Sequence, residues 1–277
     1  MTGRTAPSAA HRHVCWRYDD HAALHAEAHR FLAAGLAAGE QVWYVAPGSD
    51  PFGERLRADA VFRDALGRDA VRLVAIESAY GADEVIDPVT QVRAYAAATE
   101  AALAAGHTGL RVVADATPLV RTPAQLDAFA RYEHLVDRYL SAAPMSAMCA
   151  YDRRVLGDRA VAELACLHPE TNVDDILFRL HAGAAGDARP VLAGELDASN
   201  HDLFRTALRR AAPPAVDGRL VVQATDLSFV DHRCLIHLRE HARSRGMDAV
   251  LLRTSRSAAA RLAELLNLPG VQVEVVR

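Results

Sequence analysis

The feature that most constrains the fold of this chain is a regular alternation of short apolar runs with segments of helix length. The apolar runs between residues 19 and 168 predict strands at 41–46, 71–76, 110–114 and 145–151. Helices are expected between Asp20 and Gly39 and at 51–67, 88–105, 123–140 and 158–167. Apolar strands joined by helical crossovers are typical of a mostly parallel sheet covered on both faces. The first part of the chain is therefore predicted to be α/β.

A break in the pattern at 168–172 separates this region from a second one. Pro169 disfavours helical geometry in the residue before it, and Asn172 favours a turn. We expect a flexible N-terminus at 1–10, a first domain at 11–172 and a second domain at 173–277. In the second domain, strands are expected at 176–181, 190–196, 220–224, 249–253 and 271–276, and helices at 200–211, 232–245 and 257–267. This ββαβαβαβ order is also α/β.

Composition excludes several classes of function. All 31 basic residues are arginine, which is typical of a high-GC genome and leaves no lysine for a phosphate-binding GxxxxGK loop or a Schiff base. The formal charge of −4 gives no electrostatic reason to expect nucleic-acid binding. No run approaches the roughly 20 apolar residues of a membrane span. We expect a cytoplasmic protein without a nucleic-acid or membrane partner.

The four cysteines are scattered and form no CxxC pair, which argues against a disulfide framework or a structural zinc site. One combination of residues offers two nitrogen and two sulfur ligands for zinc, but the signal is weak because its members are far apart in sequence: His13, Cys15, Cys149 and His168. Packed thiols are the favoured interpretation, and we expect neither a metal nor a cofactor. Glu133, in the middle of a predicted helix, is expected on a solvated or ion-paired face.

The second domain contains the most distinctive motifs. GELD at 194–197 ends one predicted strand, and DLSFVDHR at 226–233 opens a helix after another. With the strand at 250–252 and LPG at 268–270, these motifs closely resemble the STAS domain of anti-sigma factor antagonists. The resemblance implies that the 226–233 turn contacts an anti-sigma factor or a similar kinase-fold partner. The residues assigned to this partner-binding switch are Asp197, Asp226, Ser228, Asp231, His232 and Arg233.

His232 departs from the STAS pattern, because that position usually carries a serine that the partner kinase phosphorylates. A histidine has no hydroxyl for this modification. The favoured interpretation is an unregulated domain; the alternatives are a histidine whose charge tunes an interface near neutral pH, and phosphorylation of the histidine itself. Ser228 is the nearest hydroxyl, but a serine in this position more often makes a local hydrogen bond.

Residues 11–180 resemble the MEDS family, a group of sensory domains. The matching segments include HVCWRYDD at 13–20, GLRVVAD at 109–115, YE at 132–133, CAYD at 149–152 and HP at 168–169. The resemblance implies a RecA-like fold without its phosphate loop and a role in sensing small molecules.

Polar residues at strand ends are the first candidates for ligand binding, since open parallel sheets bind ligands beyond the carboxyl ends of their strands. For Asp115, a capping role at the strand exit is equally compatible with the sequence. The ligand-binding candidates are His13, Tyr18, Arg111, Asp115, Tyr151 and Asp152.

Together these patterns predict a non-enzymatic signalling protein in which a sensor domain is coupled to a partner-binding STAS domain. One alternative is an enzyme or a small-molecule- or nucleotide-binding protein that uses a crevice near Asp115 and Tyr151. No GxSxG, HExxH or GxGxxG motif accompanies that crevice. A second alternative is a scaffold that assembles into homo-oligomers.

Overall fold

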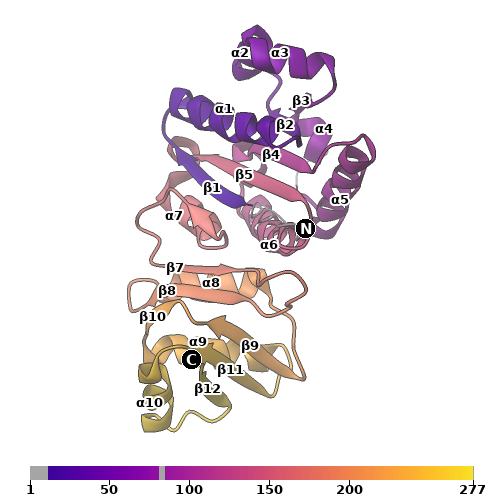
Figure 1. Cartoon of the computed structure of the whole chain (residues 1–277). Helices are drawn as coiled ribbons and strands as arrows, with labels where there is room; N and C mark the ends of the chain where they lie inside the picture. Colours follow the sequence, from indigo (N-terminus) through magenta and orange to yellow (C-terminus); the bar gives the residue numbers. More distant parts are fainter. Residues whose placement is uncertain (1–11, 81–84, 277) are drawn as a thin grey trace, which may run out of the picture.

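A computed structural model of the chain describes residues 12–80 and 85–276, and Figure 1 shows two α/β regions joined end to end. The N-terminal segment 1–10 that was expected to be flexible lies outside the described residues. Within them, no helix combines the length and the apolar character that crossing a bilayer requires.

The first region is built on a six-stranded, entirely parallel sheet, as the alternating pattern predicts. The strand order is β3-β2-β4-β5-β1-β6. The strands are β1 (His13–Tyr18), β2 (Gln41–Ala46), β3 (Val71–Ala75), β4 (Leu110–Asp115), β5 (Met145–Asp152) and β6 (Glu170–Thr171). β4 and β5 are buried along their whole length, which is expected for central strands covered on both faces.

Helices cover both faces of this sheet and form two cores. One face packs against α1 (His21–Ala37), α2 (Phe52–Ala58) and α3 (Ala60–Gly67). The other packs against α4 (Ile76–Tyr80), α5 (Pro88–Ala104), α6 (Pro123–Leu140) and α7 (Arg153–Ala165), with the 3₁₀ turn η1 (Thr117–Val120) leading into α6.

Side-chain caps start several of these helices. Asp20, Asp59 and Asp152 each accept a backbone N–H in the first turn of the helix that follows. Thr122 and Gln125 form a reciprocal capping box at α6. A single helix was expected at 51–67, but Asp59 has extended backbone angles and caps α3, so the segment forms two helices, α2 and α3.

The second region has a sheet ordered β10-β8-β9-β11-β12, with β7 antiparallel to β8 and the other pairs parallel. Its strands are β7 (Phe178–His181), β8 (Val191–Leu196), β9 (Arg219–Ala224), β10 (Leu227–Val230), β11 (Ala249–Thr254) and β12 (Val271–Val275). Its helices are α8 (His201–Ala211), α9 (His232–Ser244) and α10 (Ser257–Leu265). Gly194 is required in β8, because a Cβ there would lie 2.1 Å from the carbonyl oxygen of Leu177.

Three strands, β1, β6 and β10, were not predicted as strands, and the short strand β6 lies in the segment 168–172 that was expected only to break the pattern. β1 corresponds to the segment HVCWRY, part of the motif that resembles the MEDS family, and it lies between β5 and β6. β10 lies inside the segment that was interpreted as a turn, where Leu227–Val230 pairs with β8 at the edge of the sheet. Only the last part of that segment opens a helix.

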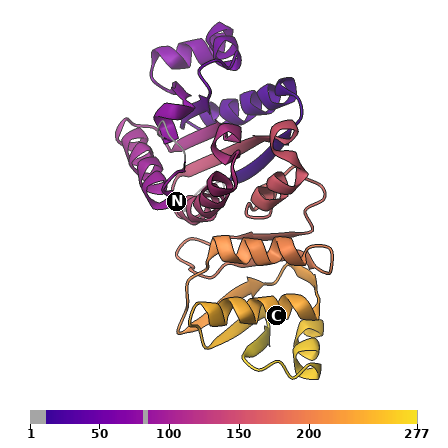
Figure 2. The same cartoon turned by 180° about the vertical axis from the view of Figure 1, so that it is seen from behind.

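The junction between the regions is packed and polar. Figures 1 and 2 show β7, β8 and α8 facing α6 and α7 across it. Arg210 of α8 forms ion pairs with Glu163 of α7 (2.8 Å) and Asp127 of α6 (3.2 Å), and its side chain is 6% exposed. The backbone N–H of Leu180 donates to the carbonyl of Cys166. The apolar core runs continuously from the first region into the second.

Candidate functional sites

The most unusual local structure is a set of titratable side chains inside the first region, which we term the buried cluster. His13 comes from the start of β1, Glu133 from α6, Cys149 from β5, and His168 from the segment after α7. One ligand-type atom from each lies within 4.8 Å of the others, and all four residues are buried. Residues that are far apart in sequence therefore meet against the face of the sheet that α6 covers.

Glu133 is at the centre of the buried cluster. Its Oε2 atom lies 3.1 Å from His13 Nε2, 3.5 Å from His168 Nε2 and 3.5 Å from Cys149 Sγ. Its other oxygen accepts a hydrogen bond from the hydroxyl of Tyr151. Of the two expectations for Glu133, a solvated face is wrong, because its side chain is fully buried, whereas it does pair with the imidazoles of His13 and His168.

The outer nitrogens of both imidazoles are held by acceptors. His13 Nδ1 lies 2.9 Å from Asp137 Oδ1, and His168 Nδ1 lies 3.0 Å from the carbonyl oxygen of Leu164. A carbonyl oxygen only accepts, so His168 Nδ1 carries the proton. His168 Nε2 is buried and has no hydrogen-bond partner.

Burial and charge act against each other in the buried cluster. For His13, burial alone lowers the pKa, but hydrogen bonds to Asp137 and Glu133 more than offset it and raise the pKa to about 9. For Glu133, burial raises the pKa, and the nearby imidazoles of His168 and His13 reverse this and hold it below its usual range. Burial and the Glu133 charge raise the pKa of the Cys149 thiol well above its ordinary value.

Three of the predicted ligand-binding residues do meet at the carboxyl ends of their strands. The Tyr18 hydroxyl donates to the Asp115 carboxylate (3.1 Å) and lies 3.4 Å from Thr117 Oγ1. Thr117 Oγ1 in turn accepts a hydrogen bond from the backbone N–H of Asp152. The Asp115 carboxyl is buried, which raises its pKa, and it accepts the Thr117 N–H. Asp152 caps α7. Asp115 therefore makes a local hydrogen bond in the loop after its strand, and Asp152 is the helix cap.

The other three predicted ligand-binding residues lie elsewhere. His13 and Tyr151 belong to the buried cluster and its surroundings. Arg111 lies at the amino end of β4, where it pairs with Glu40 at 2.5 Å and packs over the ring of Phe31. A cavity of about 340 Å³ does open at the carboxyl ends of β2 and β3, lined in part by Tyr44, Ser49 and Asp50.

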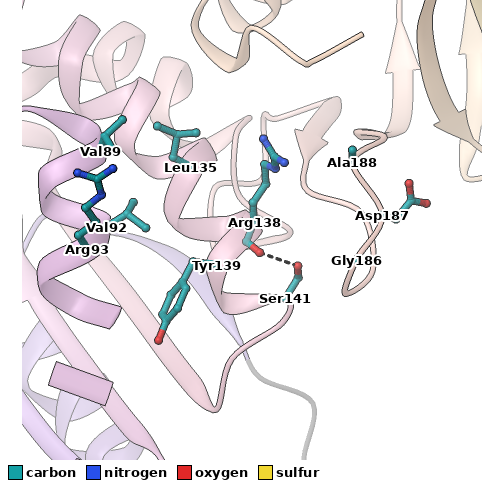
Figure 3. A pocket seen from close by; sticks show the side chains of 10 residues that line it. All are labelled: Val89, Val92, Arg93, Leu135, Arg138, Tyr139, Ser141, Gly186, Asp187 and Ala188. Carbon is teal, nitrogen blue, oxygen red and sulfur yellow. Dashed lines mark hydrogen bonds between the residues drawn. The ribbon is translucent and has the colours of Figure 1, made fainter. Parts of the chain in front are cut away.

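A second cavity lies at the junction of the two regions and has a volume of about 440 Å³. Figure 3 shows Val89 and Arg93 of α5 and Leu135 and Arg138 of α6 on one side, and the 186–188 loop on the other. Its lining combines apolar side chains with two arginines, Arg93 and Arg138, and one aspartate, Asp187. No local sequence pattern predicts this cavity, because the loop comes from the second region.

The segment assigned to partner binding forms one continuous surface, which we term the β10–α9 face. His232, Arg233, Ser228 and Asp226 are exposed on it, and Phe229 is 53% exposed. A groove of about 340 Å³ runs beside it, lined by β10, the start of α9 and α10 residues such as Ala259 and Leu262.

The acidic and hydroxyl residues of this face hold the loop geometry. Asp231 caps α9 by accepting the Cys234 N–H (2.9 Å) and pairs with His201 Nε2 at 2.6 Å. Asp197 accepts the N–H and the hydroxyl of Ser199. The Ser228 hydroxyl donates to the carbonyl of Gly194 on the neighbouring strand β8 at 2.9 Å, so a contact between strands replaces the local hydrogen bond expected from the sequence.

Comparison with known proteins identifies the first region. Residues 12–169 match the family model MEDS, described as the methanogen/methylotroph, DcmR sensory domain, and this match covers more than half of the chain. No similar protein was found among the curated ones. The chain therefore belongs to the MEDS family of sensory-domain proteins.

Proposed function

We propose that this chain is a non-enzymatic, cytoplasmic signalling protein in which the MEDS domain is the input and the second α/β region, a STAS-like domain, is the output. The output would be docking of an anti-sigma factor or similar kinase-fold protein on the β10–α9 face. The observation that carries this proposal is the exposed Phe229 beside an apolar groove, on a segment whose sequence resembles the STAS switch.

The β10–α9 face has the properties of a docking surface. Phe229 presents a large aromatic side chain from an edge strand, and aromatic residues commonly dominate binding energy at interfaces. Arg233 and His232 beside it supply a basic rim. Since His232 offers no hydroxyl, regulation by serine phosphorylation at that position is absent, and the input must come from another part of the chain.

The junction supports the MEDS domain as that input. A ligand shifts a conformational equilibrium only if it binds the two states with different affinity. The junction cavity is lined by both domains, so a ligand there would contact both. Arg93 and Arg138 favour a small molecule with an apolar body and an anionic group.

The test is direct binding of the untagged full-length chain to purified kinase-fold anti-sigma factors of its own genome, measured by calorimetry. We expect one of them to bind the wild type, and Phe229→Asp to weaken this binding at least tenfold. Val61→Asp is the matched control, because Val61 is also an exposed apolar residue (64%) but lies on α3, far from the β10–α9 face.

Two outcomes would contradict the proposal. Either no kinase-fold anti-sigma factor binds the wild type, or the Phe229→Asp and Val61→Asp variants bind equally well. Steady conversion of a small molecule by the wild type would favour the enzyme alternative.

A further inference from the structure

We propose that the buried cluster is a four-ligand binding site for one divalent transition-metal ion, with Zn²⁺ the best match. The ligand atoms would be His13 Nε2, His168 Nε2, Cys149 Sγ and Glu133 Oε2. This inference goes beyond the partner-docking function and does not depend on it.

The spacing of the four atoms suits a tetrahedral ion. Zinc bonds to nitrogen, oxygen and sulfur of about 2.0–2.3 Å place neighbouring ligand atoms roughly 3.3–3.7 Å apart in a tetrahedron. Glu133 Oε2 lies 3.1 Å from His13 Nε2 and 3.5 Å from the other two ligand atoms. Cys149 Sγ lies 4.0 Å from His13 Nε2. The separations of His168 Nε2 from His13 Nε2 and from Cys149 Sγ are within 4.8 Å, so shifts of about 1 Å or less would complete the coordination shell.

His168 provides the strongest single argument. Its Nδ1 donates to the Leu164 carbonyl, so a neutral His168 presents the lone pair of Nε2 to Glu133 Oε2 at 3.5 Å, and no described residue makes a hydrogen bond to this fully buried nitrogen. Two buried acceptors this close repel each other unless a proton or a metal ion lies between them. A metal ion would satisfy both at once.

The surrounding contacts resemble those of metal centres in general. A metal-bound histidine usually donates its second N–H to a carboxylate or a backbone carbonyl, which fixes the ring and the tautomer. Here the Asp137 carboxylate contacts His13 Nδ1 in this way, and the Leu164 carbonyl contacts His168 Nδ1. The Tyr151 hydroxyl holds the second oxygen of Glu133. Each ligand but Cys149 thus has a partner that orients it.

The donor set also determines the kind of site. Two imidazoles, a thiolate and a carboxylate match zinc better than calcium or magnesium, which prefer oxygen ligands. The thiolate and Glu133 together neutralise a divalent charge. Four protein ligands leave no open position, so the site is structural rather than catalytic.

The site would also stiffen the junction. Asp137 contacts His13 through Oδ1 and accepts the Ala182 N–H of the second domain through Oδ2 at 2.6 Å. One carboxylate therefore links a proposed metal ligand to the end of β7. Binding of the ion would fix that link.

The experiment is Co²⁺ and Zn²⁺ loading of the untagged, full-length chain after chelation and dialysis. We expect about one ion per chain by elemental analysis, and a thiolate-to-cobalt charge-transfer band with tetrahedral visible bands for Co²⁺. Cys149→Ser should abolish the charge-transfer band and weaken Zn²⁺ binding at least tenfold. Cys166→Ser is the matched control, because Cys166 is a fully buried thiol outside the cluster.

A wild-type chain that binds no stoichiometric ion, or binds cobalt without the thiolate band, would overturn the proposal. So would a Cys149→Ser variant that keeps wild-type affinity and spectrum; the cluster would then be a network of protonated histidines and carboxylates alone. If Cys149→Ser does not fold, X-ray absorption spectroscopy of the zinc-loaded wild type tests the proposal instead. The proposal requires one sulfur and three nitrogen or oxygen atoms bound to zinc, and any other set of neighbours would overturn it.

Discussion

The MEDS domain and the second region of this chain share an α/β architecture but differ in where their polar groups lie. Almost all buried polar and charged residues among those that the structure describes belong to the MEDS domain, including Glu133, His168 and Asp137. In the second domain they are Asn200, Arg210 and Thr254, and Arg210 points into the junction. The second domain instead exposes its distinctive residues on the β10–α9 face.

This difference indicates a division of roles. Burying an ionisable group is unfavourable unless partners or a metal compensate it, so the buried groups of the MEDS domain are the first candidates for a binding site inside it. A domain with an apolar interior and an exposed aromatic surface is suited to docking. The predictions below test this contrast.

The largest effect is expected from Glu133→Ala in the interior of the MEDS domain. Removing the central carboxylate leaves two buried imidazoles and the Tyr151 hydroxyl uncompensated, so the free energy of unfolding should fall by about 3–5 kcal/mol. Urea denaturation measures this. Glu100→Ala on the exposed side of α5 should change it by less than about 0.5 kcal/mol. If the two substitutions changed the free energy of unfolding equally, the contacts of Glu133 inside the MEDS domain would contribute nothing particular to stability, which would contradict this account.

Metal removal is expected to have a similar but slightly smaller effect. If the buried cluster binds Zn²⁺, free ion at 100 times its Kd stabilises the chain by about 2.7 kcal/mol, and a chelator removes that contribution. Thermal unfolding of the wild type should shift downward with chelator, whereas that of Cys149→Ser should not respond. A chelator effect that persists in Cys149→Ser would place the ion elsewhere.

At the junction, Arg210→Ala should destabilise the chain by about 1–3 kcal/mol, because Glu163 and Asp127 lose their shared buried partner. The expected cost is lower than for Glu133, since Glu163 keeps its contact with Arg159. Differential scanning calorimetry should show the two domains unfolding less cooperatively. Arg209→Ala, one residue earlier and exposed, is the control that should leave the profile unchanged.

The smallest effect on stability is expected on the β10–α9 face. Phe229→Asp replaces a side chain that is already half exposed, so the free energy of unfolding should change by no more than about 0.5 kcal/mol. The same substitution should remove partner binding. Loss of stability comparable to that of Glu133→Ala would show that Phe229 supports the fold rather than docking.

Most of the secondary structure could be predicted from the sequence, because apolar strands and capped amphipathic helices leave clear local patterns. β10 was missed because Leu227 and Val230 point inward while Ser228 and Phe229 are exposed, which does not follow strict alternation over so short a strand. Its pairing with β8 is a tertiary contact that local patterns do not encode.

The buried cluster could be predicted only in part. His13, Cys149 and His168 were considered together, but wide spacing in sequence says little about distance in a parallel sheet, where β1 and β5 are neighbours. Glu133 carried a usable signal that was overlooked, since it lies four residues after Phe129 and three before Val136 on the buried face of α6. A carboxylate on that stripe indicates a buried polar site.

Hydrogen–deuterium exchange of the full-length chain with and without Zn²⁺ tests the division of roles most directly. We predict slower exchange on adding Zn²⁺ in β1, β5 and the second half of α6, together with 166–182 at the junction, and no change at 227–262. The second region has its own group of potential ligands where the starts of α8 and α9 lie close together, namely His201, Asp231 and Cys234. Protection centred on that group, or no protection in β1 and β5, would contradict the account.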